Sequence, residues 1–394
     1  MDYSFRLLFG VFLLAMLPAC QFINLNPGFE PDTELERRVL GDFSLSVPDP
    51  QLLQMTPELQ SYLETHVPAN LSGWNLVSRL QELLFSEDYL NISYDESANL
   101  TAAGVFAQRQ ANCLSLVGLY ITMARHYGLD ANYQTVQVRP VWDRRGSLLV
   151  LSEHVNAIGR LNSTDRYIID FTPEVRLQHN TARIVSDQNA RALYFNNMAV
   201  ESLIAGDLQQ AREYATFAVR TDSELDLAWN TLGSILNRLD EPELAEYSYQ
   251  KSAWLNRNNP SAINNLARFY AAQGDEETAE RYRRAVESYN QRNPYYHYSL
   301  GGVAFEAEQF QDAVGHFQQA IRRNDLEPDF YFALGVTYRE LGDEELADQV
   351  LQLAAAMREL GDQVYRPTQD RVRRIDGRSI LRSSSAGFTV EFVD

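Results

Sequence analysis

The feature that most constrains the fold is a period of 34 residues in the second half of the sequence. Five units begin at Ala192, Asp226, Pro260, Pro294 and Pro328. In each unit the seventh residue is apolar, the eighth is glycine or alanine, and the twentieth is alanine. Small residues at fixed positions let two helices approach closely. A constant period of this length therefore predicts a row of stacked helical hairpins.

The turn between the two helices of a unit is Gly-Asp in the first, third and fifth units. Period and register together resemble the tetratricopeptide repeat over residues 192–361. The resemblance implies an all-α superhelix whose concave groove binds a protein or peptide partner. The third unit departs from register because Ala285 stands one position early, which predicts a local irregularity in its second helix. Otherwise we expect one continuous stacked array.

The first half contains an amphipathic segment, 112–128, that predicts a helix beginning after Asn112 and closing at Gly128. Cys113 falls in its first turn. Unpaired backbone N–H groups and the helix dipole favour a thiolate there, which predicts a lowered pKa for Cys113. Such a nucleophile needs a base, for which His154 is the candidate and Asp170 the candidate orienting group.

The histidine and the aspartate lie in segments with the alternating pattern of strands. Residues 133–138 and 148–158 predict two strands around a turn at 143–146, and residues 166–171 predict a third strand. Alternation puts His154 and Asn156 on one strand face, and Ile168 and Asp170 on one face of the next strand. Helices followed by an antiparallel meander predict an α+β domain that ends near residue 188. His126, at the far end of the cysteine helix, is the poorer candidate base.

The order Cys113, His154, Asp170, with its context over residues 100–173, resembles the transglutaminase-like branch of the papain-like cysteine superfamily. The resemblance implies a Cys113 nucleophile, a His154 base and an Asp170 orienting group in acyl transfer or hydrolysis through a thioester. Many members have glycine where this chain has Ala111. The backbone N–H of Cys113 is one candidate oxyanion donor, and Gln108 or Gln110 could supply a second.

The N-terminus predicts export and lipidation. Arg6 is followed by a short apolar run and then by Leu17-Pro18-Ala19-Cys20, which resembles the lipobox of bacterial lipoproteins. The resemblance implies a signal peptide over residues 1–19 and lipid on Cys20. In bacterial lipoproteins, an aspartate directly after the lipidated cysteine is associated with retention in the inner membrane. This chain has Gln21 there, so the resemblance favours a periplasm-facing outer-membrane location. An ordinary secretory signal is the alternative. Residues 20–50 are assigned to the lipidated N-terminus and its tether, which is extended through about Asp32.

Composition limits the possible partners. The formal net charge of −19 argues against nucleic-acid binding. The sequence contains no metal-ligand cluster or glycine-rich phosphate loop, so we expect no cofactor. The tail, 362–394, leaves the repeat and holds six arginines, which predicts a partly ordered segment.

Two functions remain from the sequence. One is a membrane-anchored thiol enzyme formed by residues 51–188 and linked to a binding array. The other is a non-catalytic scaffold that uses the repeats to bind a protein.

Overall fold

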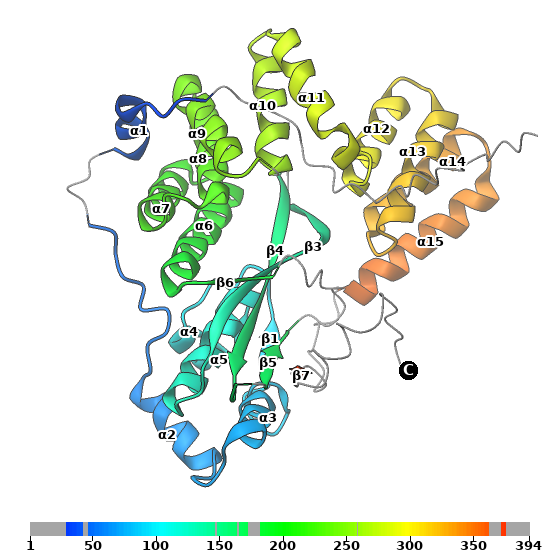
Figure 1. Cartoon of the computed structure of the whole chain (residues 1–394). Coiled ribbons are helices and arrows are strands. Elements are labelled where there is room, and N and C mark those ends of the chain that lie inside the picture. Colours follow the sequence, from blue (N-terminus) through cyan, green and yellow to red (C-terminus); the bar gives the residue numbers. More distant parts are fainter. Residues whose placement is uncertain are drawn as a thin grey trace, which may run out of the picture.

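The structure is a computed structural model that describes residues 29–41, 46–145, 148–163, 165–171, 182–257, 259–361 and 372–375. Figure 1 shows an N-terminal domain of helices and a sheet, from which the helical repeats extend. The helices of the first part are α1 (Thr33–Leu40), α2 (Pro57–His66), α3 (Gly73–Phe85), α4 (Ala102–Gln108) and α5 (Cys113–His126). The strands are β1 (Ser93–Tyr94), β2 (Gln110–Ala111), β3 (Asn132–Arg145), β4 (Leu148–Arg160), β5 (Arg166–Ile169), β6 (Arg183–Val185) and β7 (Val372–Ile375).

The main sheet has the strand order β6-β3-β4-β5-β7, with antiparallel neighbours throughout. The predicted meander is confirmed as β3, β4 and β5. Helix α5 packs against one face of the sheet. Tyr133 of β3 is directly opposite Ala157 of β4, and its hydroxyl lies 2.8 Å from where a side chain on Gly118 of α5 would begin. Gly118 therefore lets helix and sheet approach closely.

The repeats form the remaining helices. They are α6 (Asp187–Ala205), α7 (Leu208–Thr221), α8 (Asp226–Arg238), α9 (Pro242–Leu255), α10 (Pro260–Ala272), α11 (Glu276–Asn290), α12 (Pro294–Glu306), α13 (Phe310–Arg323), α14 (Pro328–Glu340) and α15 (Glu344–Gly361). Consecutive helices pair as antiparallel hairpins, as the period predicts. Each turn between paired helices has one residue with positive φ, which is Gly206, Asp240, Gly274, Glu308 or Gly342.

Among the residues whose side chains the structure describes, the buried apolar residues of the array fall into more than one cluster. The single continuous stack stays a prediction. A single core cluster runs from the N-terminal domain to Val286 of α11, in the third repeat. Two smaller clusters, one around Phe330 and one around Phe317, each join residues of the fourth and fifth repeats. Helix α11 is continuous, so the irregularity predicted from Ala285 does not interrupt it. The boundary between the described clusters lies between α11 and α12.

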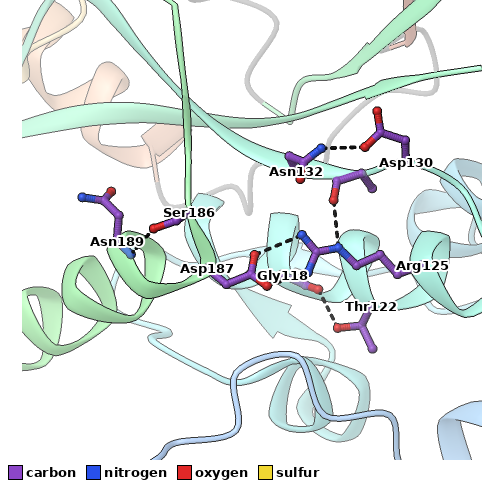
Figure 2. A network of polar contacts seen from close by, with 9 residues as sticks. Gly118, Thr122, Arg125, Asp130, Asn132, Ser186, Asp187 and Asn189 are labelled. Atoms are coloured by element: carbon purple, nitrogen blue, oxygen red, sulfur yellow. Dashed lines mark hydrogen bonds and ion pairs between the residues drawn. The ribbon is translucent and has the colours of Figure 1, made fainter. Parts of the chain in front are cut away.

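A polar network joins the N-terminal domain to the first repeat (Figure 2). The guanidinium of Arg125, at the end of α5, donates two hydrogen bonds of 2.6 and 3.0 Å to the carboxylate of Asp187, the first residue of α6. Its Nε donates a third, of 2.9 Å, to the carbonyl of Ala131. Ser186 caps α6 by accepting from the N–H of Asn189. One side chain therefore fixes α5, the start of β3 and the start of α6 together.

Two terminal segments lie where the sequence did not predict them. Helix α1, within the predicted tether region, packs on α9 and α7 of the repeats. Strand β7, within the predicted arginine-containing tail, pairs with β5 and forms one edge of the main sheet. Among the described residues no helix is long and apolar enough to cross a membrane.

Candidate functional site

The N-terminus of α5 is held by a buried polar network. The side chain of Asn112 caps the helix by accepting from the N–H of Ser115 at 2.9 Å, as predicted. Its Nδ2 donates to Oδ1 of Asn99, and its backbone N–H donates to the carbonyl of Ala98. The Ser115 hydroxyl donates to the same carbonyl at 3.2 Å. The position of Cys113, the first residue of the helix, is thereby fixed against the preceding loop.

Cys113 is half-buried, and its environment raises rather than lowers the pKa of its thiol. Burial is the main cause. Hydrogen bonds from the Leu114 N–H, the Tyr94 side chain and its own N–H act in the opposite direction, and the charge of Glu96 adds to the rise. The predicted lowering is therefore wrong for the resting structure, because loss of solvation outweighs the helix terminus.

The strands that carry the other two candidates are neighbours. His154 lies within β4, where its backbone is opposite Val136, and β4 pairs with β5 through Ala157 and Ile169. Asp170 follows β5 directly and is only 2% exposed. The side chain of His154 lies outside the described part of the structure. The fold thus brings the two strands together, while the approach of the three side chains stays a prediction.

Sequence reasoning missed three residues around this site. Tyr94 and Glu96 reach Cys113 because β1 runs parallel to β2, a pairing of two-residue strands that leaves no periodic signal. Asn156, two residues after His154, is completely buried, and among the described side chains neither its Oδ1 nor its Nδ2 has a hydrogen-bond partner. Its place in an alternating strand was visible in the sequence, but its burial was not.

The candidate oxyanion donors other than the Cys113 N–H lie just before the helix. Gln108 ends α4 and Gln110 begins β2, and both are exposed. Between them Arg109 has a φ of 61°, so the chain reverses sharply there. Ala111 is buried opposite Tyr94 in the β1–β2 pair. Neither glutamine is distinguished as a donor by this geometry.

Comparisons with known proteins identify the last repeats of the array. A family model described as tetratricopeptide repeat matches residues 298–362. The chain therefore contains tetratricopeptide repeats, as their period predicts, and repeats of this type support protein–protein interaction. No curated protein matches the chain.

Solved structures with repeat arrays resemble part of the chain. The APC/C hetero-tetramer Cut9–Hcn1 is 22% identical with a TM-score of 0.32, over 43% of this chain and 34% of that one. The chain thus spans about a third of that relative. PilF of Pseudomonas aeruginosa is 20% identical with a TM-score of 0.34, over 44% and 78% of the two chains. MamA from Desulfovibrio magneticus RS-1 is 18% identical with a TM-score of 0.30, over 45% and 99%.

Proposed function

We propose that this protein is a membrane-anchored scaffold that binds a protein or peptide partner through its repeat array. The observation that carries the proposal is apolar surface on the first helices of the last two repeats. Val303 of α12 is 68% exposed and Phe332 of α14 is 46% exposed, and these helices contact each other. Solenoid arrays of this kind bind partners along such surfaces, and exposed apolar side chains supply the contact.

The test begins with the full-length protein cross-linked in cells and its partner identified from the membrane fraction. Binding of that purified partner is then measured with the double variant Val303→Ser, Phe332→Ser. We expect at least about tenfold weaker binding, since apolar anchors at the centre of an interface typically dominate affinity. Ile204→Ser is the matched control, because Ile204 is 37% exposed but lies on α6, at the other end of the array. Unchanged binding by the double variant contradicts the proposed surface.

The anchor in this proposal is lipid on Cys20, supported by the lipobox-like Leu17-Pro18-Ala19-Cys20. Two or more acyl chains hold a protein on a bilayer firmly, at about 0.8 kcal/mol per buried methylene. We place the mature protein on the periplasmic side of the outer membrane. Cys20→Ser should release it from the membrane fraction. A variant that stays membrane-bound and is cleaved at the same place contradicts lipidation.

A second candidate function is acyl transfer or hydrolysis by a transglutaminase-like domain, supported by Cys113 at a capped helix start and by the pairing of β4 with β5. His154 would take the thiol proton as Sγ attacks an amide or ester carbonyl, and would return it to the leaving group. Water or an amine would then cleave the thioester, while Asp170 orients the imidazole. Burial raises the pKa of the Cys113 thiol, so this proposal gives His154 the role of general base.

To test the proposed catalysis, the protein is treated with p-nitrophenyl acetate, and the acetylation of Cys113 is measured over time by mass spectrometry. Removing the base as His154→Ala should slow acetylation at pH 7 by about 10²- to 10⁴-fold. Asp170→Asn should slow it less, since the base remains. His126→Ala is the control and should react like wild type. Equal acetylation rates in wild type and His154→Ala would contradict the proposed catalysis and leave the scaffold function as the remaining proposal.

A further inference from the structure

The N-terminal segment makes a side-chain interface with the second repeat. The ring of Phe29 lies 5.3 Å from the ring of Tyr247 and 5.9 Å from that of Trp254, both on α9. Farther along, Val39 and Leu40 of α1 are buried and belong to the main core cluster. The segment runs antiparallel to α9, with Phe29 near the end of that helix and α1 nearer its start.

A partly buried polar cluster fixes the register of this contact. Glu36 of α1 accepts from the hydroxyl of Tyr247 at 3.0 Å and from Nζ of Lys251 at 3.4 Å. Lys251 is only 8% exposed, and its Nζ lies over three aromatic rings, which are those of Phe29, Trp229 and Trp254. A buried ammonium needs an anionic partner, and Glu36 supplies it. At the other end of the contact Arg38 pairs with Glu243 at 2.8 Å.

The segment also contains the residues that begin and end its helix. Asp32 caps α1 by accepting from the N–H groups of Glu34 and Leu35 at 2.8 and 3.0 Å. Gly41 ends the helix with a φ of 68°. An eight-residue helix is marginal alone in water. Its order therefore depends on the surface formed by α7 and α9.

We propose that residues 29–40 are an intramolecular clasp that holds the first two repeats close to the membrane to which Cys20 is attached. Phe29 is nine positions after Cys20, and a chain of this length spans at most about 30 Å. The repeat array, rather than the N-terminal domain, is then the part of the protein positioned nearest the anchor. This orientation rests on the proposed lipidation, whereas the clasp itself does not.

The clasp is tested by amide hydrogen exchange on the full-length protein with Glu36→Ala. Removing the carboxylate leaves Lys251 buried without its anion, so protection of residues 35–40 should fall about 10- to 100-fold. Glu34→Ala is the matched control, because Glu34 pairs with Arg37 inside α1 and is 63% exposed. Equal protection in wild type and Glu36→Ala, or equal loss in both variants, overturns the clasp.

The orientation is tested with purified lipidated protein in vesicles that contain an acceptor-labelled lipid. In a Cys113→Ser background, a donor dye is placed at Arg257→Cys, just after α9, or at Glu340→Cys, in the fifth repeat; both positions are exposed. Energy transfer should be greater from position 257, and Glu36→Ala should reduce it. Equal transfer from both positions overturns the orientation. Protein that does not sediment with vesicles contradicts lipidation instead, and the exchange experiment still decides the clasp.

Discussion

Gly301 offers a sharp test of how the repeats pack. A Cβ added there would lie 2.5 Å from Cε1 and 2.6 Å from Cδ1 of Phe317, against an ordinary carbon–carbon contact of about 3.5–4.0 Å. Phe317 is 3% exposed and is packed within its own cluster, so its ring has little room to move. Overpacking of this size costs about 1–3 kcal/mol, and the better helix propensity of alanine returns about 1 kcal/mol. We expect Gly301→Ala to destabilise the protein by up to about 2 kcal/mol.

The neighbouring residue is the control. An added Cβ on Gly302 meets nothing within 4 Å. Gly302→Ala should therefore gain about 0.5–1 kcal/mol from helix propensity alone. The same chemical change at adjacent positions of α12 should shift stability in opposite directions. If both variants unfold at the same urea concentration, the assigned helix crossing is wrong.

The assay can also show which part of the array responds. The four tryptophans, Trp74, Trp142, Trp229 and Trp254, all lie before α12. Tryptophan fluorescence thus follows the N-terminal domain and the second repeat, while circular dichroism follows all helices. Among the described side chains, the cluster that contains Phe317 is separate from the main one, so Gly301→Ala should shift the dichroism transition and leave the fluorescence transition unchanged. A common shift of both signals would show one cooperative unit and refute this separation.

Three further changes follow from local geometry. Glu308→Gly should stabilise the fourth repeat by about 0.5–1 kcal/mol in urea unfolding, because Glu308 has a φ of 59° that glycine adopts without strain. Asn112→Ala should cost about 2–3 kcal/mol by thermal or urea unfolding, since it removes the α5 cap and leaves the buried Oδ1 of Asn99 without its donor. Burial raises the pKa of Asp226, so the folded state binds a proton more tightly than the unfolded state, and stability falls as pH rises from the ordinary aspartate range. The stability of Asp226→Asn relative to wild type should therefore increase between pH 3.5 and 7; no change with pH would contradict this.

Local periodicity predicted the elements that depend on neighbours in sequence. The N-cap at Asn112, the helix from Cys113, the three central strands and the paired helices of each repeat follow from side-chain spacing within one element. The small eighth residue of a unit was also informative, because Gly301 stands against Phe317 sixteen positions later in the same hairpin. These contacts are short in sequence, so the pattern that forms them is visible in a short window.

Contacts distant in sequence were not predictable in this way. Strand β7 has four residues and pairs with β5 some two hundred positions earlier, so nothing in its own pattern identifies its partner. The strands of the parallel pair β1–β2, which brings Tyr94 to Cys113, are shorter still, with two residues each. The pKa of Cys113 was mispredicted for a related reason. A helix terminus can be read from sequence, whereas the burial that outweighs it depends on segments packed around the thiol.

These distant contacts also order the assembly of the protein. Helix α1 needs α9 before it can bury Val39 and Leu40, and β5 lacks its outer neighbour until β7 is present. Both closures join segments about two hundred residues apart, about half the length of the chain. Contacts of such sequence separation are slow to form because a long loop must close first. The sheet edge beside Asp170 is therefore completed only after the repeats have been made. Until then β5 presents an open edge, the kind of surface on which strands of other molecules pair, and β7 covers it in the finished fold.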